Sequence, residues 1–252
     1  MSTLFISDLH IDAQRPEIAA QFLEFLHTEA AGAEALYILG DLFESWVGDD
    51  APDTAQGAVL AGLNALTTAG VPCFVMHGNR DFLLSDGFCA LSGARLLADP
   101  TVLTLYGRRV LVMHGDALCT DDVSYQRLRA AVRDAAWQAQ FLALTVGQRR
   151  ELANAARAGS RAHMATLPEQ IADVNAAGVA AVLRDSGVNL LLHGHTHRPA
   201  IHQLAVDGRP CERIVLGDWY SQGSVLHWDS GGFALRTLPR NTQAGAGPGG
   251  PE

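Results

Sequence analysis

Residues 36–41 read Leu-Tyr-Ile-Leu-Gly-Asp, four consecutive apolar residues followed by a glycine and an aspartate. The same arrangement, an apolar run that ends in a short polar cluster, recurs along the 252-residue chain. The five clusters are Asp8-Leu9-His10, Gly40-Asp41, Gly78-Asn79-Arg80-Asp81, His114-Gly115-Asp116 and Gly194-His195-Thr196-His197. Apolar runs that are continuous, and do not alternate with polar residues, are typical of strands buried on both faces of a sheet.

Helical patterns separate these runs. Segments 18–31 and 55–69 have helical spacing without an internal proline, and Gly70-Val71-Pro72 is a helix-stop signal. Residues 102–105 and 109–113 predict a hairpin that turns at Gly107. Further strands are expected around residues 213–216, 224–228 and 233–237. This order predicts an α/β fold in which two sheets form a sandwich.

The chain is organised as one domain, residues 1–240, with one helical insertion and a tail. From about residue 121 to 177 the strand pattern stops, and seven of the eighteen arginines lie between Arg127 and Arg161. Two interpretations of this segment stay open: a plain helical insertion packed on the core, or a cap with a basic, apolar-lined mouth. Residues 241–252 contain only Gly, Pro, Ala and polar residues, so we expect a disordered tail.

Composition excludes several classes of protein. Nearly half the residues are hydrophobic, which supports a large core, and the net charge of −9 argues against non-specific nucleic-acid binding. All eighteen basic residues are arginine, so chemistry that needs a lysine amine is excluded. The four cysteines form no C-x-x-C pair, and the start of the chain predicts a strand without a signal peptide. We therefore expect a cytoplasmic protein, with attachment to a membrane surface left open.

The five polar clusters predict a metal centre. Ligands of open α/β sheets bind beyond the carboxyl ends of the strands, so these clusters should converge. They supply seven oxygen and imidazole donors: Asp8, His10, Asp41, Asn79, His114, His195 and His197. Seven donors exceed the need of one tetrahedral ion, and mixed O/N ligation suits Mn²⁺, Fe²⁺ or Zn²⁺. Asp41 is the natural bridge between two ions, which together activate water and neutralise charge on a phosphoryl group.

The order D-x-H, G-D, G-N-R-D, H-G-D, G-H-x-H resembles the calcineurin-like metallophosphoesterase superfamily over residues 2–240. The resemblance implies an αββα sandwich with a helical cap insertion. It also implies two sets of ligands, Asp8, His10, Asp41 and His197 for one ion, and Asp41, Asn79, His114 and His195 for the other. Where much of the superfamily has a histidine after the metal-binding asparagine, this chain has Arg80, for which we expect a charge clamp on phosphate.

Longer strings, including YILGDLFESWVGDD at 37–50 and HGHTHRPA at 193–200, resemble the family of UDP-2,3-diacylglucosamine pyrophosphohydrolases of lipid A biosynthesis. The resemblance implies hydrolysis of the acylated UDP-sugar to UMP and 2,3-diacylglucosamine 1-phosphate (lipid X), with metal-activated water attacking the phosphorus nearer uridine. It implies two Mn²⁺ ions per chain and catalytic roles for Asp41, Asn79, Arg80 and His195. It further implies a peripheral protein at the cytoplasmic face of the bacterial inner membrane, without nucleic acid or an obligate protein partner.

In that family the cap covers the metal site and receives the acyl chains and the glucosamine phosphate. The implied substrate contacts are Asn79, Arg80, Asp122, Arg157, Ser160 and His195. The family often has polar residues where this chain has Met164 and Leu167, for which Arg161 is a possible substitute.

Several interpretations stay open at this point. Trp137, Phe141 and Leu142 suit either a membrane interface or core packing, and Asp49-Asp50 is interpreted as a solvated acidic loop. The alternative function is another dinuclear metallophosphoesterase, such as a dinucleoside polyphosphate hydrolase or a protein phosphatase. A scaffold without metal is disfavoured because all seven donors are present.

Overall fold

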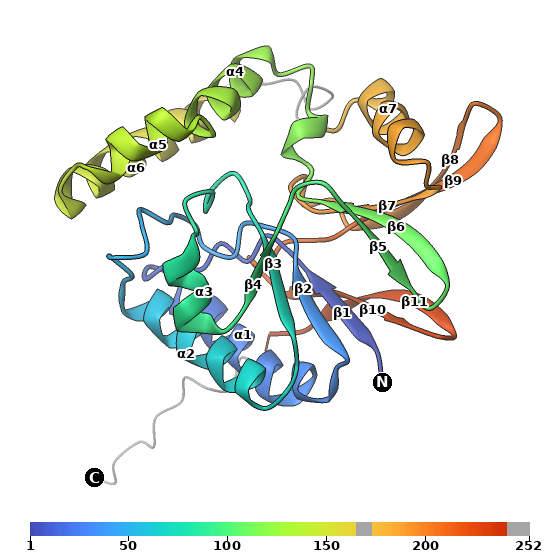
Figure 1. Cartoon of the computed structure of the whole chain (residues 1–252), viewed down its shortest axis with the longest axis horizontal. Helices are drawn as coiled ribbons and strands as arrows, with labels where there is room; N and C mark the ends of the chain where they lie inside the picture. The colour runs from blue at the N-terminus through green and yellow to red at the C-terminus, as the bar shows by residue number, and fades with distance from the viewer. Residues whose placement is uncertain (165–172, 241–252) are drawn as a thin grey trace, which may run out of the picture.

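The computed structural model describes residues 1–164 and 173–240, which form four layers, helix, sheet, sheet and helix (Figure 1). The six-stranded sheet has the order β11-β10-β1-β2-β3-β4, and the five-stranded sheet has the order β5-β6-β7-β9-β8. The first sheet consists of β1 (Thr3–Ile6), β2 (Ala35–Ile38), β3 (Cys73–Met76), β4 (Arg95–Leu97), β10 (Gly223–Asp229) and β11 (Gly232–Leu238). The second consists of β5 (Thr101–Leu105), β6 (Arg108–Met113), β7 (Leu190–His193), β8 (Ala200–Val206) and β9 (Arg209–Val215).

Helices cover both outer faces of the sandwich. On the six-stranded sheet lie α1 (Pro16–Thr28), α2 (Thr54–Thr68) and α3 (Asp86–Ser92). On the five-stranded sheet lies α7 (Ala176–Ser186), whose Val179 and Leu183 are buried against β6 and β7. No helix in the described ranges is long and apolar enough to cross a membrane.

The continuous apolar runs are explained by this burial on two sides. In β1, Leu4 and Ile6 face the helices, whereas Phe5 faces the second sheet. Val110 and Val112 of β6 pack between the sheets, and Leu111 packs against α7 with its neighbours. Successive side chains of a strand point to opposite faces, so a strand covered on both faces has no polar position. The predicted two-sheet αββα fold is confirmed.

The elements β4, α3 and β8 were not predicted. β4 has three residues, α3 has seven, and β8 is an edge strand whose side chains are mostly exposed. These elements carry too few buried residues to show a period in the sequence.

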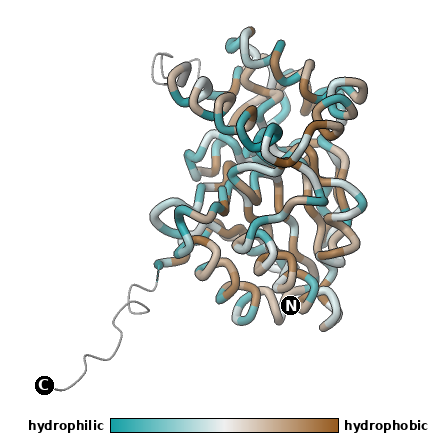
Figure 2. The backbone as a smooth tube through the Cα atoms, turned by 90° about the vertical axis from the view of Figure 1, so that its left-hand side faces the viewer, coloured by the Kyte–Doolittle hydropathy of each residue, from teal (hydrophilic) through white to brown (hydrophobic). Residues whose placement is uncertain are grey.

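The insertion forms three helices, α4 (Val123–Val132), α5 (Ala135–Leu142) and α6 (Val146–Met164), which lie across one end of the sandwich (Figure 1). We call these helices the cap. Figure 2 shows that the cap carries hydrophilic and hydrophobic residues together, whereas the central strands are mainly hydrophobic. The predicted end of the insertion, residue 177, falls within α7, a core helix. The predicted tail at 241–252, and Leu167, lie outside the described residues.

The cap is held to the core by packing and by one buried arginine. Phe141 is buried and its ring stacks on that of Trp137 at a centroid distance of 5.2 Å, and Trp137 approaches Phe82 of the core. Of the two interpretations, core packing is therefore the correct one for Trp137 and Phe141, whereas the Leu142 side chain is exposed. Arg149 of α6 is buried and donates to Val47 O at 2.6 Å.

The interpretation of Asp49-Asp50 as a solvated loop is correct only in that Asp50 is exposed, because both carboxylates also have specific partners. Both oxygens of Asp50 accept from the Arg149 guanidinium, at 2.7 and 2.5 Å. Asp49 accepts from Trp46 Nε1 at 2.8 Å and from the Phe88 amide at 2.9 Å, in the first turn of α3. A bidentate arginine–carboxylate pair fixes the relative orientation of two segments, and a carboxylate that accepts from a helix N-terminus fixes that end of the helix. These two residues therefore fix the cap and α3.

Candidate metal centre

The five polar clusters meet at one end of the sandwich, because β1, β2 and β3 run parallel in one sheet, and β6 and β7 run parallel in the other. Two groups of candidate ligands form there, with ligand atoms that lie within 4.8 Å of one another inside each group. The groups are Asp8, His10 and His197, and Asp41, His114 and His195. Asn79 joins the second group, because its Oδ1 lies 3.0 Å from His114 Nε2 and 2.9 Å from His195 Nδ1. The structure thus brings all seven predicted donors together.

Asp41 lies between the two groups. Its Oδ2 is 3.7 Å from His10 Nε2 in one group and 3.8 Å from His114 Nε2 in the other. Its Oδ1 accepts a hydrogen bond of 2.8 Å from the Arg80 amide, which fixes the orientation of the carboxylate. One oxygen is therefore directed at both sites, as a bridging ligand requires.

The backbone at these ligands is unusual. Asp8, His10, Asp41, His195 and His197 have φ values of 56, 51, 53, 67 and 56°. Positive φ is uncommon for residues other than glycine, and such strain persists mainly where a functional site demands it. In this conformation the chain turns sharply after each strand, so that neighbouring loops direct their donors to one point.

The hydrogen bonds of the ligand side chains leave Asp8 Oδ1 and His114 Nε2 with free electron pairs in the site. Asp8 Oδ2 accepts from Ser7 Oγ at 2.5 Å and from the His195 amide at 2.8 Å, whereas its buried Oδ1 has no hydrogen-bond partner among the described residues. His114 Nδ1 lies 2.9 Å from Leu39 O and donates to it, so Nε2 carries the lone pair. A buried carboxylate oxygen without a donor is costly unless a cation is bound. The residues present therefore fit divalent ions.

The electrostatics of the site favour cations. Burial would raise the pKa of Asp8, but the charges of the nearby imidazoles of His197, His114 and His10 hold it well below its usual range. Burial would lower the pKa of His114, but Asp41, Asp116 and Asp8 raise it to about 9. Burial and the neighbouring charge of His114 lower the pKa of His195 to about 4. The carboxylates thus favour positive charge at His114, and a metal ion held by this group would take the place of the proton.

Sequence reasoning missed two carboxylates behind the ligands. Glu44 Oε2 lies 3.1 Å from His10 Nδ1, and Asp218 Oδ2 lies 3.4 Å from His197 Nδ1. A carboxylate behind a ligating imidazole fixes its tautomer and raises its basicity. The sequence held a signal for Asp218, because Gly217-Asp218 follows the apolar residues at the end of β9, just as Gly40-Asp41 follows β2.

Two further aspartates that belong to the quoted motifs hold the loops in place. Asp81 is fully buried and accepts from the amides of Gly78 and Leu42, each at 2.8 Å. Asp116 is fully buried and accepts from Tyr125 Oη at 2.6 Å and from Arg129 Nε at 2.8 Å. Because Tyr125 and Arg129 are in α4, Asp116 connects the cap to the metal-site loop.

A cavity of about 400 Å³ lies between the metal centre and the cap. Half of its lining residues are polar, among them Asn79, Arg80 and Arg157, and Arg80 Nε is buried without a partner in the described chain. The other half are apolar: Trp46, Phe82, Leu83, Leu128, Val132, Trp137, Phe141, Leu152, Ala153 and Ala156. The cap interpretation with an apolar-lined mouth therefore holds.

Only some of the predicted substrate contacts line this cavity. Arg157 and Ser160 of α6 line the cavity together with Asn79 and Arg80. Asp122 is absent from the described lining and is the N-cap of α4, where it accepts from the Tyr125 amide at 2.9 Å. The His195 ring stacks with the Tyr125 ring at a centroid distance of 6.2 Å. Substrate contact by His195 and by Asp122 stays a prediction.

Comparison with known proteins agrees with this geometry. The sequence profile described as calcineurin-like phosphoesterase matches residues 1–199, and the chain belongs to this family. Within it, a protein of Stenotrophomonas maltophilia (strain K279a), named UDP-2,3-diacylglucosamine hydrolase, is 52% identical over 95% of this chain and 100% of its own. A protein of the same name from Xanthomonas axonopodis pv. citri (strain 306) is 54% identical over 94% of this chain and 99% of its own.

Similarity to solved structures is weaker. An archaeal phosphodiesterase has a TM-score of 0.48 and 11% identity, over 94% of this chain and all of its own. This similarity is too weak to add to the family assignment.

Proposed function

We propose that this protein hydrolyses the pyrophosphate bond of UDP-2,3-diacylglucosamine, giving UMP and 2,3-diacylglucosamine 1-phosphate, in lipid A biosynthesis. One observation carries the proposal: the two donor groups, with Asp41 between them, lie beside a cavity that Asn79 borders and that arginines and many apolar side chains line. A substrate with a pyrophosphate and two acyl chains matches both kinds of lining. Relatives at 52–54% identity carry the name of this activity.

The protein side chains have separable tasks in this reaction. Two divalent ions, when bound, lower the pKa of water and neutralise charge on a phosphoryl group. Arg80 in the cavity lining offers guanidinium donors to a phosphate oxygen, and the apolar side chains exclude water from the acyl chains. His195, held neutral by burial, offers an N–H or a lone pair at the second group. We propose Mn²⁺ as the metal, because mixed carboxylate, amide and imidazole donors suit it.

The direct test measures UMP release from UDP-2,3-diacylglucosamine by the purified chain. We expect release that depends on added Mn²⁺ and is abolished by chelation. A dinucleoside polyphosphate and a phosphopeptide, assayed in parallel, represent the alternative functions. Faster hydrolysis of either compound than of the UDP-sugar would reject the proposed function.

The position of water attack gives a prediction about isotope incorporation. We propose attack on the phosphorus nearer uridine, so hydrolysis in ¹⁸O-labelled water should place one label in UMP. Mass spectrometry of both products measures this directly. Label in the sugar 1-phosphate would reverse the orientation of the substrate over the two ions.

Arg157 provides a prediction about the cap. Its side chain lines the same cavity as Arg80. Loss of one charge-assisted hydrogen bond to phosphate costs ~1.5–3 kcal/mol, or about one to two decades in kcat/KM. We therefore expect Arg157→Ala to lose at least tenfold with a short-chain substrate in detergent, while metal content is unchanged. A loss below twofold would show that Arg157 serves the surface and not the substrate.

We further propose that the protein is peripheral at the cytoplasmic face of the inner membrane, and that no obligate protein partner is needed. Four apolar side chains of the cap are exposed, Val123, Leu128, Leu142 and Leu152, and Leu128 and Leu152 also line the cavity. Exposed apolar residues beside arginines favour anionic lipid surfaces. Flotation with anionic vesicles should recover the protein, and Leu142→Glu should reduce the recovered fraction several-fold. Equal recovery would contradict the membrane proposal.

A further inference from the structure

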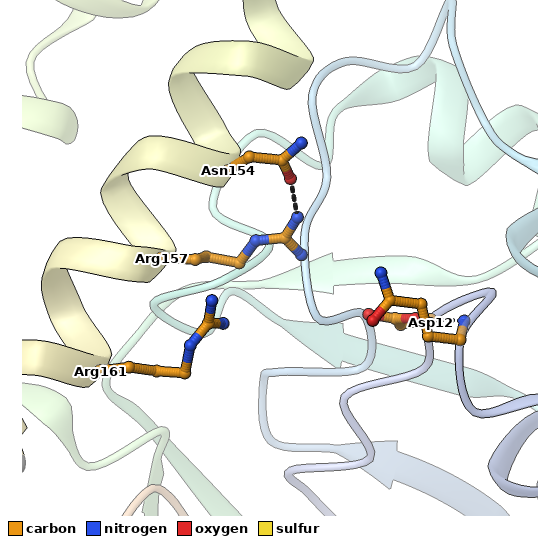
Figure 3. Close-up of a pocket in the computed structure, with 5 residues that line it drawn as sticks. Asp12, Asn154, Arg157 and Arg161 are labelled. Carbon is orange, nitrogen blue, oxygen red and sulfur yellow. Dashed lines mark hydrogen bonds between the residues drawn. The ribbon is translucent and has the colours of Figure 1, made fainter.

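A second pocket, of about 220 Å³, lies between the loop that follows β1 and the cap helix α6 (Figure 3). Its lining comes from Asp12 and Gln14 of the loop, and from Asn154, Arg157 and Arg161 of α6. Figure 3 shows the side chains of Arg157 and Arg161 extending from the helix towards Asp12. Every lining residue is polar or charged, in contrast to the apolar walls of the first cavity.

This polar pocket lies beside one of the two donor groups. Asp12 is two residues beyond His10, and Arg15 of the same loop donates to His10 O at 3.2 Å. The apolar cavity borders Asn79 and Arg80 beside the other group, and it also borders Glu44, which lies behind His10. Arg157 lines both spaces. A pyrophosphate held at the two donor groups would thus have two spaces of different chemistry near it, one for each half of the substrate.

The polar pocket offers hydrogen-bonding groups that the protein itself does not use. Asp12 Oδ1 accepts from the Gln14 amide at 2.5 Å, which leaves its other oxygen available. Arg157 donates to the side-chain oxygen of Asn154, which leaves the Asn154 NH₂ available. In the part of the chain that the structure describes, the Arg161 guanidinium and the Gln14 carboxamide have no partner.

These groups match the chemistry of a nucleoside monophosphate. A carboxylate accepts from ribose hydroxyls, as acidic residues do in dinucleotide sites. Carboxamides supply both donors and acceptors, which the carbonyls and the N–H of a uracil ring require. Arginine binds phosphate oxygens through paired N–H donors. An acyl chain, in contrast, would leave all of these groups desolvated and unpaired.

We infer that the pocket formed by Asp12, Gln14, Asn154, Arg157 and Arg161 binds the UMP half of the substrate. This inference rests on the proposed function, which supplies a uridine nucleotide as substrate and product. The pocket volume is about 220 Å³, whereas pockets that enclose a whole ligand have roughly 300–1,000 Å³. The smaller volume suits a subsite that holds only half of the substrate. The acylated sugar occupies the larger, apolar cavity.

The first test measures UMP binding to the Mn²⁺-loaded protein by calorimetry. Asp12→Ala and Arg161→Ala should each weaken the UMP Kd at least tenfold. Arg127→Ala, which removes an exposed arginine of α4 outside both spaces, is the matched control and should stay within twofold. AMP and inorganic phosphate are compared on the wild type. Equal affinity for UMP and phosphate would overturn the inference, because phosphate alone would then be recognised.

The second test separates this inference from the proposed function. Wild type and variants are assayed with UDP-2,3-diacylglucosamine and with bis(p-nitrophenyl) phosphate, which has no nucleoside. The inference predicts at least tenfold loss of kcat/KM on the UDP-sugar only. Equal losses on both substrates, or no loss on either, would overturn it.

If the wild type does not cleave the UDP-sugar, the proposed function fails, and the UMP titration then decides on the pocket alone. Asp12→Asn and Arg161→Gln replace any alanine variant whose thermal unfolding shows a damaged fold.

Discussion

Replacing Asp41 by alanine is expected to abolish hydrolysis and to remove both metal ions, while the chain stays folded. Asp41 Oδ2 lies 3.7 Å from His10 Nε2 and 3.8 Å from His114 Nε2, so one oxygen serves both donor groups. Without it, two ions at short separation lose the anionic bridge that reduces their mutual repulsion. Metal ions contribute several kcal/mol to the transition state, so we expect a loss of about a thousandfold or more in kcat/KM.

We test this prediction by measuring the metal content per chain, the activity and the circular dichroism of the variant. His114→Ala should weaken mainly the ion of its own group, and excess Mn²⁺ should partly restore activity. Asp207→Ala is the matched control, because Asp207 is exposed and also has a positive φ, 52°, far from the metal loops. Near wild-type turnover and metal content in Asp41→Ala would rule out a dinuclear centre bridged by this residue.

The second large effect is expected at Gly78, which has no side chain where the β2 and β3 loops meet. A Cβ at this position would overlap Asp41 Oδ1 and the Asp41 backbone nitrogen. The Gly78 amide also donates to buried Asp81 at 2.8 Å, so the loop has no room to retreat. Gly78→Ala should therefore displace the bridging carboxylate and lower kcat/KM at least ~100-fold, in line with the loss of a positioned charge.

Gly78→Ala should also lower the melting temperature by several degrees, because overpacking costs about 1–3 kcal/mol. Gly57→Ala in α2 is the control, since nothing lies within 4 Å of its Cβ position. That change should stabilise the protein by roughly 0.5–1 kcal/mol, because alanine is the better helix former. Metal content and activity near wild type in Gly78→Ala would show that the two loops can separate without harm.

The metal centre was visible in the sequence because each donor follows a buried strand. Strand ends are fixed by the fold, so Asp8, Asp41 and His114 had to lie near one another once the sheet order was set. Seven predicted donors meet at the carboxyl ends of five strands, in the two groups that the resemblance implied. Their number and mixed chemistry already excluded a single tetrahedral zinc site.

The carboxylates behind these ligands could not be assigned in the same way. Glu44 reaches His10 from three residues beyond Asp41, and Asp218 reaches His197 from the end of β9. Such contacts depend on loop conformations, including the positive φ angles at the ligands, which no periodic pattern encodes.

The sequence by itself determined the α/β sandwich, the strand ends and the seven donors, because burial on two faces and the residues that end each strand are local properties of the chain. Only the tertiary structure decided where the cap lies. Arg149 and Asp50 are 99 residues apart in sequence and pair to fix α6. That placement creates the apolar cavity and the polar pocket, since each is lined by one wall from the cap and one from the core. Side chains that meet across two walls have no sequence spacing in common, which is the physical reason spacing alone could suggest a lined mouth but not which residues enclose either space.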